Sequence, residues 1–239
     1  MSILIVENLV AGYGKIPILQ GASLEIQQGD FVGIIGPNGA GKSTFAKALF
    51  GLVDILEGKV ILDDEDITRL RTELRVKKGM GFVPQLDNVF QELSVLENLE
   101  MGGVSLDSKT RNALITTILN VFPELKPKLG DKAKVLSGGE RQMLAVGRSL
   151  MTKPKLLVLD EPSAGLSPVM TERLFKGLLE INKMGVTLLI VEQNIKRIEK
   201  VVQRVAVFVQ GKKVFEGRSS EIDPDNLIAT YFGALNKTW

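Results

Sequence analysis

The chain has 239 residues, 44% of them hydrophobic, so it is long enough to bury one large α/β core or two smaller ones. Its 30 Lys and Arg against 28 Asp and Glu leave a net charge of +2, which argues against a dedicated nucleic-acid-binding surface. Cysteine and histidine are absent, which excludes disulfides, thiolate metal sites and imidazole catalysis. Any chemistry must therefore use carboxylates, amides, hydroxyls, lysine or a bound cation.

The apolar runs of the chain do not predict a membrane span. Residues 1–9 lack the basic start and the long apolar stretch of a signal peptide. The runs at 156–159 and 186–191 are far shorter than the roughly 20 residues needed to cross a bilayer. We expect a soluble chain that reaches a membrane only through partners.

Four short, nearly continuous apolar runs predict strands that are buried on both faces, as in a parallel sheet. These runs are Phe31–Ile35, Met80–Val83, Leu156–Leu159 and Val186–Val191. The run Gly58–Leu62 and the segment 205–216 do not have the pattern of parallel strands. The segment 205–216 predicts a hairpin that turns at Gln210 and Gly211. We expect an antiparallel layer alongside a parallel core.

The stretch between residues 86 and 151 carries no strand pattern and predicts a helical subdomain. Its helical periodicity, in residues 94–103 and 110–122, is interrupted by Pro123 and Pro127. We expect this subdomain to be inserted into the α/β core.

The predicted domain is therefore a single one, with 1–85 and 151–239 as the α/β core and 86–150 as the helical subdomain. Near the C-terminus, Leu227–Phe232 predicts a short helix and Asn236–Trp239 predicts a loose tail.

A complete phosphate-loop pattern follows the strand predicted at 31–35 and precedes a helical pattern. Glycines in such a loop let backbone N–H groups turn toward an anion, and the helix adds the positive end of its dipole. Lys42 is placed to contact the β- and γ-phosphates, and the Ser43 hydroxyl is placed to coordinate Mg²⁺. The alternative is a glycine-rich turn without a ligand. The predicted nucleotide-binding residues of this loop are Gly36, Pro37, Asn38, Gly39, Ala40, Gly41, Lys42, Ser43 and Thr44.

A pair of carboxylates, Asp160 and Glu161, ends the apolar run that begins at Leu156. The C-terminal ends of parallel strands are where α/β sheets bind their ligands. The alternative is an acidic pair that faces solvent. Asp160 is predicted to bind Mg²⁺ through a water, and Glu161 is predicted to be the general base, because the chain has no histidine for that task. Together with the phosphate loop, the pair predicts a site for a nucleotide and Mg²⁺; the family resemblance below implies that the nucleotide is ATP.

Residues 136–140 read Leu-Ser-Gly-Gly-Glu and open a helical pattern before the Asp160 strand. This run resembles the signature motif of ABC ATPases. The resemblance covers essentially the whole chain, from Tyr13, through Gln85 after a strand and the helical insertion, to the acidic pair. It implies a P-loop NTPase fold with a RecA-like, mostly parallel sheet, an N-terminal antiparallel β layer and an inserted helical subdomain.

The resemblance also implies partners. In that family two such domains, identical or different, face each other head to tail, and Ser137, Gly138 and Gly139 of one contact the γ-phosphate bound by the other. It implies transmembrane permease subunits, indirect contact with a solute-binding protein, and a peripheral place on the cytoplasmic face of the cell membrane. Nucleic acid is not an expected partner.

Two further positions take roles from the resemblance, each with a structural alternative. Tyr13 is expected to stack on adenine, and the alternative is an ordinary half-buried strand tyrosine. Gln85 is expected to contact Mg²⁺ or the attacking water and to link the core to the helical insertion. The alternative for Gln85 is a polar residue that caps a strand end.

Two positions depart from the family pattern. Gln193 occupies the place of a histidine that holds the γ-phosphate; its amide can donate a hydrogen bond but carries no charge. Ser167 occupies the place of an aspartate that couples the two sites of the dimer. We expect weaker coupling or a mixed pair of subunits.

The runs VEQN, SAGLSP and ENLEMGG resemble the ATPase subunits of branched-chain amino acid importers. The alternatives are the ATPase of a lipid or polysaccharide exporter and a non-transport ABC ATPase. Four apolar residues after Gln85 predict either a groove for a helix of the membrane partner or a buried helix face. They are Leu93, Val95, Leu96 and Leu99.

Overall fold

The computed structural model describes residues 1–86 and 88–221, and the chain divides into two compact units. The first unit combines residues 1–75 with the described residues from 187 onward, and the second comprises residues 76–186. The predicted helical subdomain, 86–150, falls within the second unit, but its boundaries stay a prediction. The predicted C-terminal helix at 227–232 and tail at 236–239 lie outside the described residues.

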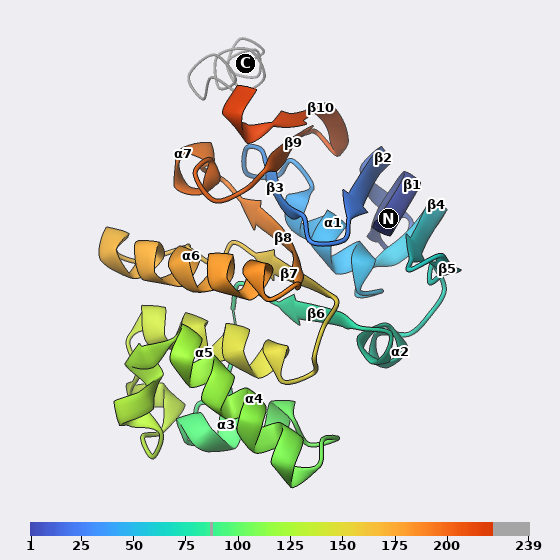
Figure 1. Ribbon diagram of the computed structural model, residues 1–239. Coiled ribbons are helices and arrows are strands. Elements are labelled where there is room, and N and C mark those ends of the chain that lie inside the picture. The colour runs from blue at the N-terminus through green and yellow to red at the C-terminus, as the bar shows by residue number, and fades with distance from the viewer. Residues whose placement is uncertain (87, 222–239) are drawn as a thin grey trace. The chain divides into compact units, whose positions relative to one another are not determined.

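The N-terminal part of the first unit is an antiparallel sheet (Figure 1) with the order β2-β1-β4-β5. Its strands are β1 (Ser2–Tyr13), β2 (Ile16–Gln27), β4 (Asp54–Leu62) and β5 (Glu65–Asp66). Register shifts interrupt the pairing of β1 with both β2 and β4. The predicted N-terminal antiparallel layer is confirmed.

The first unit also contains parallel strands, built around β3 (Phe31–Ile35), which is buried along its whole length. β3 pairs in parallel with β8 (Thr187–Glu192) on one side and with β9 (Arg204–Val209) on the other. β9 continues into β10 (Lys212–Arg218) as an antiparallel hairpin. As predicted, the hairpin turns at Gln210 and Gly211, and both have positive φ, 47° and 78°.

In the described part of the first unit, short helical elements follow β3, β8 and β10. α1 (Lys42–Leu49) follows β3, and its Phe45 packs edge to face on Phe208 of β9 with ring centroids 5.2 Å apart. α7 (Ile195–Ile198) follows β8, and the 3₁₀ turn η3 (Ser219–Glu221) follows β10. α2 (Thr72–Lys77) lies at the boundary between the units in sequence.

A fully buried arginine stabilises the C-terminal end of α1. The guanidinium of Arg75 donates hydrogen bonds to the carbonyls of Ala48 and Leu49, at 2.9 and 2.7 Å, and to those of Thr68 and Leu70. Burial lowers the pKa of Arg75 to about 10. The side chain supplies partners for carbonyls that a helix end leaves unpaired.

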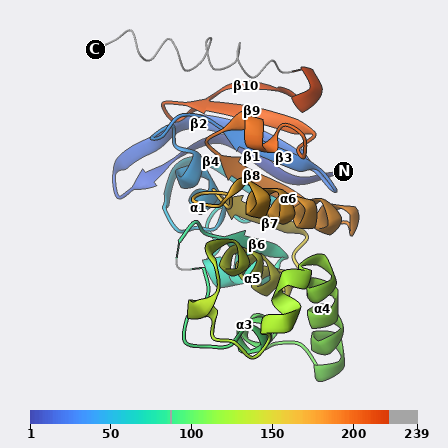
Figure 2. The ribbon, with the colours of Figure 1, turned by 90° about the vertical axis from the view of Figure 1, so that its left-hand side faces the viewer.

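The second unit pairs two parallel strands, β6 (Met80–Val83) and β7 (Leu156–Asp160), and its other described elements are helices and 3₁₀ turns. The helices are α3 (Val95–Gly102), α4 (Ser108–Val121), α5 (Gly138–Leu150) and α6 (Pro168–Lys183), with 3₁₀ turns η1 (Pro123–Lys128) and η2 (Ala133–Val135). Figure 2 shows α3, α4 and α5 gathered into one bundle, where each pair is in contact. From 88 to 151 the described chain is helices and turns with an isolated bridge between Ser94 and Lys132, as the sequence predicts.

Candidate active site

The phosphate-loop sequence connects β3 to α1, as predicted, in a conformation that depends on glycine. Gly39 and Gly41 have φ values of 78° and 93°, a region that favours glycine. Gly41 is the N-cap residue of α1, so no side chain caps the helix, and its first turn contains no acidic residue. The positive end of the helix dipole is therefore not neutralised by a carboxylate of that turn, which suits an anion.

Position 36 requires glycine because of its contact with a neighbouring strand, whereas the motif suggests a phosphate contact. A Cβ at this position would lie 2.2 Å from the carbonyl oxygen of Phe208 in β9. A side chain at 36 would therefore push the loop away from the strand beside it. This glycine fixes where the loop begins.

Lys42 is 4% exposed, and its ammonium group donates hydrogen bonds to the carbonyls of Gly36, at 2.9 Å, and Pro37, at 3.1 Å. A buried charge needs such partners, and here they come from the loop itself. The lysine thus places a positive charge at the loop and stabilises the loop's fold. Thr44 is also buried, and Ser43 is partly exposed.

The acidic pair lies at the end of β7, in the second unit. Asp160 is 3% exposed, and Glu161 leaves the strand with a φ of 46°. A residue with a Cβ pays roughly 1–2 kcal/mol for this left-handed conformation. Non-glycine residues with a left-handed backbone occur often at functional sites, where the surrounding structure holds them in this conformation.

Gln85 and Glu161 are brought together by the fold of the second unit. The Nε2 of Gln85 donates a 3.1 Å hydrogen bond to Oε2 of Glu161. Gln85 follows β6 and Glu161 follows β7, and these strands are parallel neighbours, so their carboxyl ends meet at one edge. Two predicted site residues that are far apart in sequence are therefore in direct contact.

The Ser-Gly-Gly run begins α5. Ser137 is the N-cap residue and forms a capping box with Glu140: the Glu140 N–H donates to the Ser137 hydroxyl at 3.3 Å, and the Ser137 N–H donates to Glu140 Oε2 at 2.9 Å. Ser137 and Gly138 are exposed, whereas Gly139 is buried. A Cβ at Gly139 would lie 2.4 Å from Cε of Met170 in α6, so this glycine lets the two helices approach.

Glu140 also forms an ion pair with Lys128 at 2.8 Å. Partial burial raises the pKa of the Glu140 carboxyl, but the Lys128 ammonium and the hydrogen bonds with Ser137 outweigh it, so the pKa lies below its ordinary value. The start of α5 is therefore fixed in place by a charged network.

The remaining predicted residues lie at element ends. Tyr13 ends β1 and is 52% exposed, so its ring is open to solvent. Gln193 is exposed directly after β8. Ser167 is the N-cap residue of α6, where its hydroxyl accepts a hydrogen bond from the Met170 N–H at 3.4 Å. Serine and aspartate both cap helices well, so this departure from the family pattern preserves the local fold.

The four apolar residues predicted to form either a groove or a buried helix face differ in their burial. Val95 and Leu99 are fully buried and belong to the core of the second unit. Leu96 is 36% exposed and Leu93 is partly exposed. The buried-face interpretation is therefore right for Val95 and Leu99, and the groove interpretation is wrong for them.

Asn98 of α3 is a residue that the sequence analysis did not single out. It is fully buried, its Oδ1 accepts from the Phe90 N–H at 2.8 Å, and its Nδ2 donates to the carbonyls of Phe90 and Ser94, both at 2.9 Å. It therefore shapes the segment between Gln85 and α3. The available signal was a polar residue at a buried position of the helical pattern.

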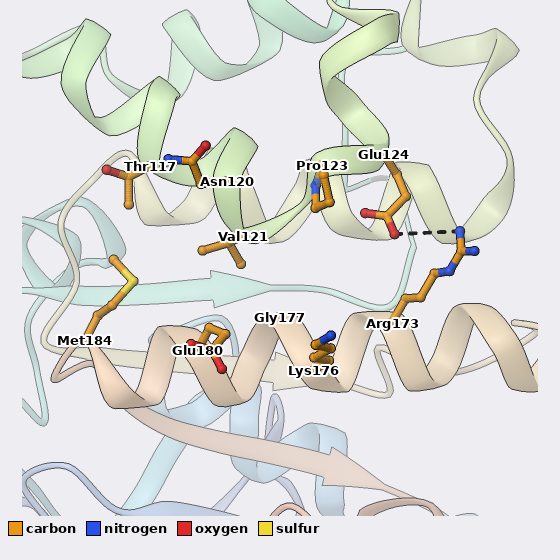
Figure 3. Close-up of a pocket in the computed structure, with 10 residues that line it drawn as sticks. All are labelled: Thr117, Asn120, Val121, Pro123, Glu124, Arg173, Lys176, Gly177, Glu180 and Met184. Atoms are coloured by element: carbon orange, nitrogen blue, oxygen red, sulfur yellow. Dashed lines mark ion pairs between the residues drawn. The ribbon is translucent and has the colours of Figure 1, made fainter.

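A cavity of about 740 Å³ lies between α4, η1 and α6 of the second unit (Figure 3). Arg173 and Glu124 pair across it at 3.6 Å. Its wall contains apolar, acidic and basic residues. None of the predicted site residues lines it.

The chain matches the family model described as ABC transporter over residues 19–164. It is 39% identical over 216 residues to the probable branched-chain amino acid transport ATP-binding protein LivF of Archaeoglobus fulgidus, covering 90% of this chain and 92% of the relative. It is 32% identical over 234 residues to the lipopolysaccharide export system ATP-binding protein LptB of Haemophilus influenzae, covering 95% of both chains.

Among solved structures, the fold is similar to that of MJ1267, an ATP-binding cassette of an ABC transporter, crystallised in its ADP conformation. The TM-score is 0.88 with 29% sequence identity, and the match covers 99% of both chains. Within the described residues, no helix has the length and apolar character that a bilayer crossing requires. The fold, the family match and the two motif-bearing units lead to one conclusion: this chain belongs to the ABC transporter family and is an ATP-binding ATPase of that family.

Proposed function

We propose that this ATPase drives the uptake of branched-chain or related amino acids. The observation that carries this proposal is the 39% identity to a probable branched-chain amino acid transport ATPase over 90% of the chain. The match to the lipopolysaccharide export ATPase is lower, at 32%.

The proposed chemistry uses the oxygen and nitrogen donors of the predicted site residues. Lys42 and the glycine-rich loop bind the phosphates, and the Ser43 hydroxyl and the Asp160 carboxylate bind Mg²⁺, a cation that prefers oxygen ligands. When bound, Mg²⁺ neutralises the charge of the phosphates. Gln85 contacts the attacking water or the cation, and Glu161 accepts a proton from that water.

Two more side chains complete the proposed site. Tyr13 stacks on adenine, for which its exposed ring is suited. Gln193 donates an amide hydrogen bond to the γ-phosphate from the end of β8.

ATPases of this family dimerise and pair with membrane subunits of transporters. For this chain we propose a head-to-tail pair, either with a second copy or with a similar ATP-binding subunit. The exposed Ser137 and Gly138 at the start of α5 would then contact the γ-phosphate bound by the partner. Because the helix dipole points its positive end at this position, a triphosphate suits it.

The proposed membrane contact uses exposed apolar side chains in α3 and in the segments directly before and after it. They are Leu86, Phe90, Leu96, Met101 and Val104. Isolated apolar residues are normal on a surface, whereas a contiguous exposed apolar patch marks an interaction site, and we propose that these residues form one. The ATPase would thus sit on the cytoplasmic face of the membrane, bound to permease subunits that receive solute from a binding protein.

The test is to purify the chain with its membrane partners and reconstitute the complex in proteoliposomes. Addition of the solute-binding protein loaded with leucine should stimulate ATP hydrolysis, whereas the unloaded binding protein should not. Export of lipopolysaccharide by the complex, or recovery of the chain with ribosomes or DNA in place of membrane proteins, would contradict amino acid import.

A further inference from the structure

A buried amide links the loop that carries Gln85 to the helix that begins at Gly138. Gln142, one turn into α5, is 6% exposed, and its Oε1 accepts a 2.7 Å hydrogen bond from Nδ2 of Asn88. Asn88 lies three residues after Gln85, and the same Nδ2 also approaches the carbonyl of Pro84 at 3.4 Å. Asn88 thus connects the segment around Gln85 to α5 by a side-chain contact.

The other half of the Gln142 amide is unusual. Its Nε2 is buried and has no hydrogen-bond partner within the described part of the chain. A buried donor without a partner is destabilising, and buried polar groups in native structures are nearly always paired. A methionine would fill a similar volume without this penalty. The presence of an amide at this position therefore points to a task other than packing.

The contact lies between two functional motifs. On one side, Gln85 donates to Glu161, the proposed general base. On the other side, Gln142 belongs to the helix whose first residues are Gly138 and Gly139. A shift of the Gln85 loop would break or reorient the Asn88–Gln142 bond, and the unpaired Nε2 gives the amide a donor for a second arrangement.

We propose that Gln142 is a positioning residue for ATP hydrolysis, which couples the Gln85 loop to the Ser-Gly-Gly end of α5 through Asn88. The proposal rests on the roles proposed above for Gln85, Glu161 and Ser137. It predicts that removal of the amide changes catalysis without loosening the fold.

The test compares Gln142→Met, Asn88→Ala and the double variant in steady-state ATP hydrolysis by the full chain. Each single variant should lower kcat by about tenfold, with the KM for ATP unchanged, because the loop would no longer be aligned with α5. The double variant should be no slower than the slower single variant, since both changes break one contact. The melting temperature of Gln142→Met should stay within about 2 °C of the parent or rise, because the unpaired donor is gone.

Two further variants separate this role from a structural one. Gln142→Glu keeps a side-chain oxygen that can accept from Nδ2 of Asn88 and should retain a higher kcat than Gln142→Met. Asn182→Leu removes another side-chain amide bond of the second unit, a 3.0 Å bond to the Val186 carbonyl, and should leave kcat unchanged.

A parent-like kcat in Gln142→Met, or a loss of kcat that follows the loss of melting temperature across the set, would overturn the proposal. Gln85→Ala and Glu161→Gln are measured in parallel. If these two retain the parent rate, the proposed active-site roles fail, whatever Gln142 does; if they lose activity while Gln142→Met does not, only the positioning role fails.

Discussion

Nε2 of Gln85 donates a hydrogen bond of 3.1 Å to Oε2 of Glu161, although the two residues are 76 positions apart in sequence. The contact joins the amide proposed to bind the cation or water with the carboxylate proposed as general base. Glu161 is further constrained by its left-handed backbone, with φ at 46°. The orientation of this carboxylate is therefore determined by both its backbone and a neighbouring side chain, as a group that must face an attacking water requires.

Glu161→Gln should lower kcat for ATP hydrolysis by at least about a hundredfold, because a positioned general base contributes 10²–10⁴. The Kd for ATP should stay close to that of the parent, since the phosphate loop is unchanged. Phosphate release and calorimetry measure the two quantities. Glu172→Gln, a change of an exposed acid in α6, is the matched control and should retain the parent kcat. Hydrolysis by Glu161→Gln at the parent rate would remove Glu161 from its role.

Lys42→Ala should abolish detectable ATP binding in calorimetry. The change removes the phosphate contact and also leaves the carbonyls of Gly36 and Pro37 without their ammonium donor. Lys47→Ala, in the last turn of the same helix, is the control and should bind ATP as the parent does. An unchanged Kd in Lys42→Ala would show that the nucleotide binds elsewhere.

Gln193→His should retain or raise ATPase activity. The side chain at 193 is exposed directly after β8, and an imidazole there can donate to a γ-phosphate oxygen as the amide does, with an added charge when protonated. The measurement is kcat as a function of pH, since histidine adds a titration near neutrality that the parent lacks. A steep loss of activity at all pH values would mean that the side chain does not contact the phosphate.

Glu140→Gln should destabilise the chain by about 1 kcal/mol at neutral pH, since the charge that pairs with Lys128 is lost while the capping geometry is kept. The pKa of Glu140 lies below its ordinary value of 4.5, so its ionised form stabilises the fold above that value. This stabilisation is lost as the pH falls through the folded-state pKa. Urea unfolding of parent and variant should therefore differ at neutral pH and converge in acid; a constant difference at all pH values would contradict the ion-pair account.

Much of the fold could be predicted from the sequence because the strands of the parallel core are short and nearly continuous in apolar residues. The bounds of β3 and β6 match the predicted runs, and the hairpin turn at Gln210 and Gly211 lies where it was expected. The antiparallel strands β1 and β2 could not be delimited in the same way, because register shifts disturb the alternation on which strand prediction depends.

The site residues that belong to contiguous sequence motifs could be predicted from the sequence. The reasons for individual glycines could not: Gly36 is required by the carbonyl of Phe208 and Gly139 by the side chain of Met170, both distant in sequence. The contact between Asn88 and Gln142 was also beyond sequence reasoning, because it depends on how a loop meets a helix.

We propose that two ATP-binding subunits close around the nucleotide, with the Ser137 end of α5 opposite the phosphate loop of the partner. Analytical size-exclusion of Glu161→Gln with ATP and Mg²⁺, alone and mixed with the second ATP-binding subunit recovered from the transporter, tests it most directly. We predict a dimer that forms only with ATP and is lost when Ser137→Arg is added. A chain that binds ATP yet stays monomeric, both alone and with the second subunit, would contradict this arrangement.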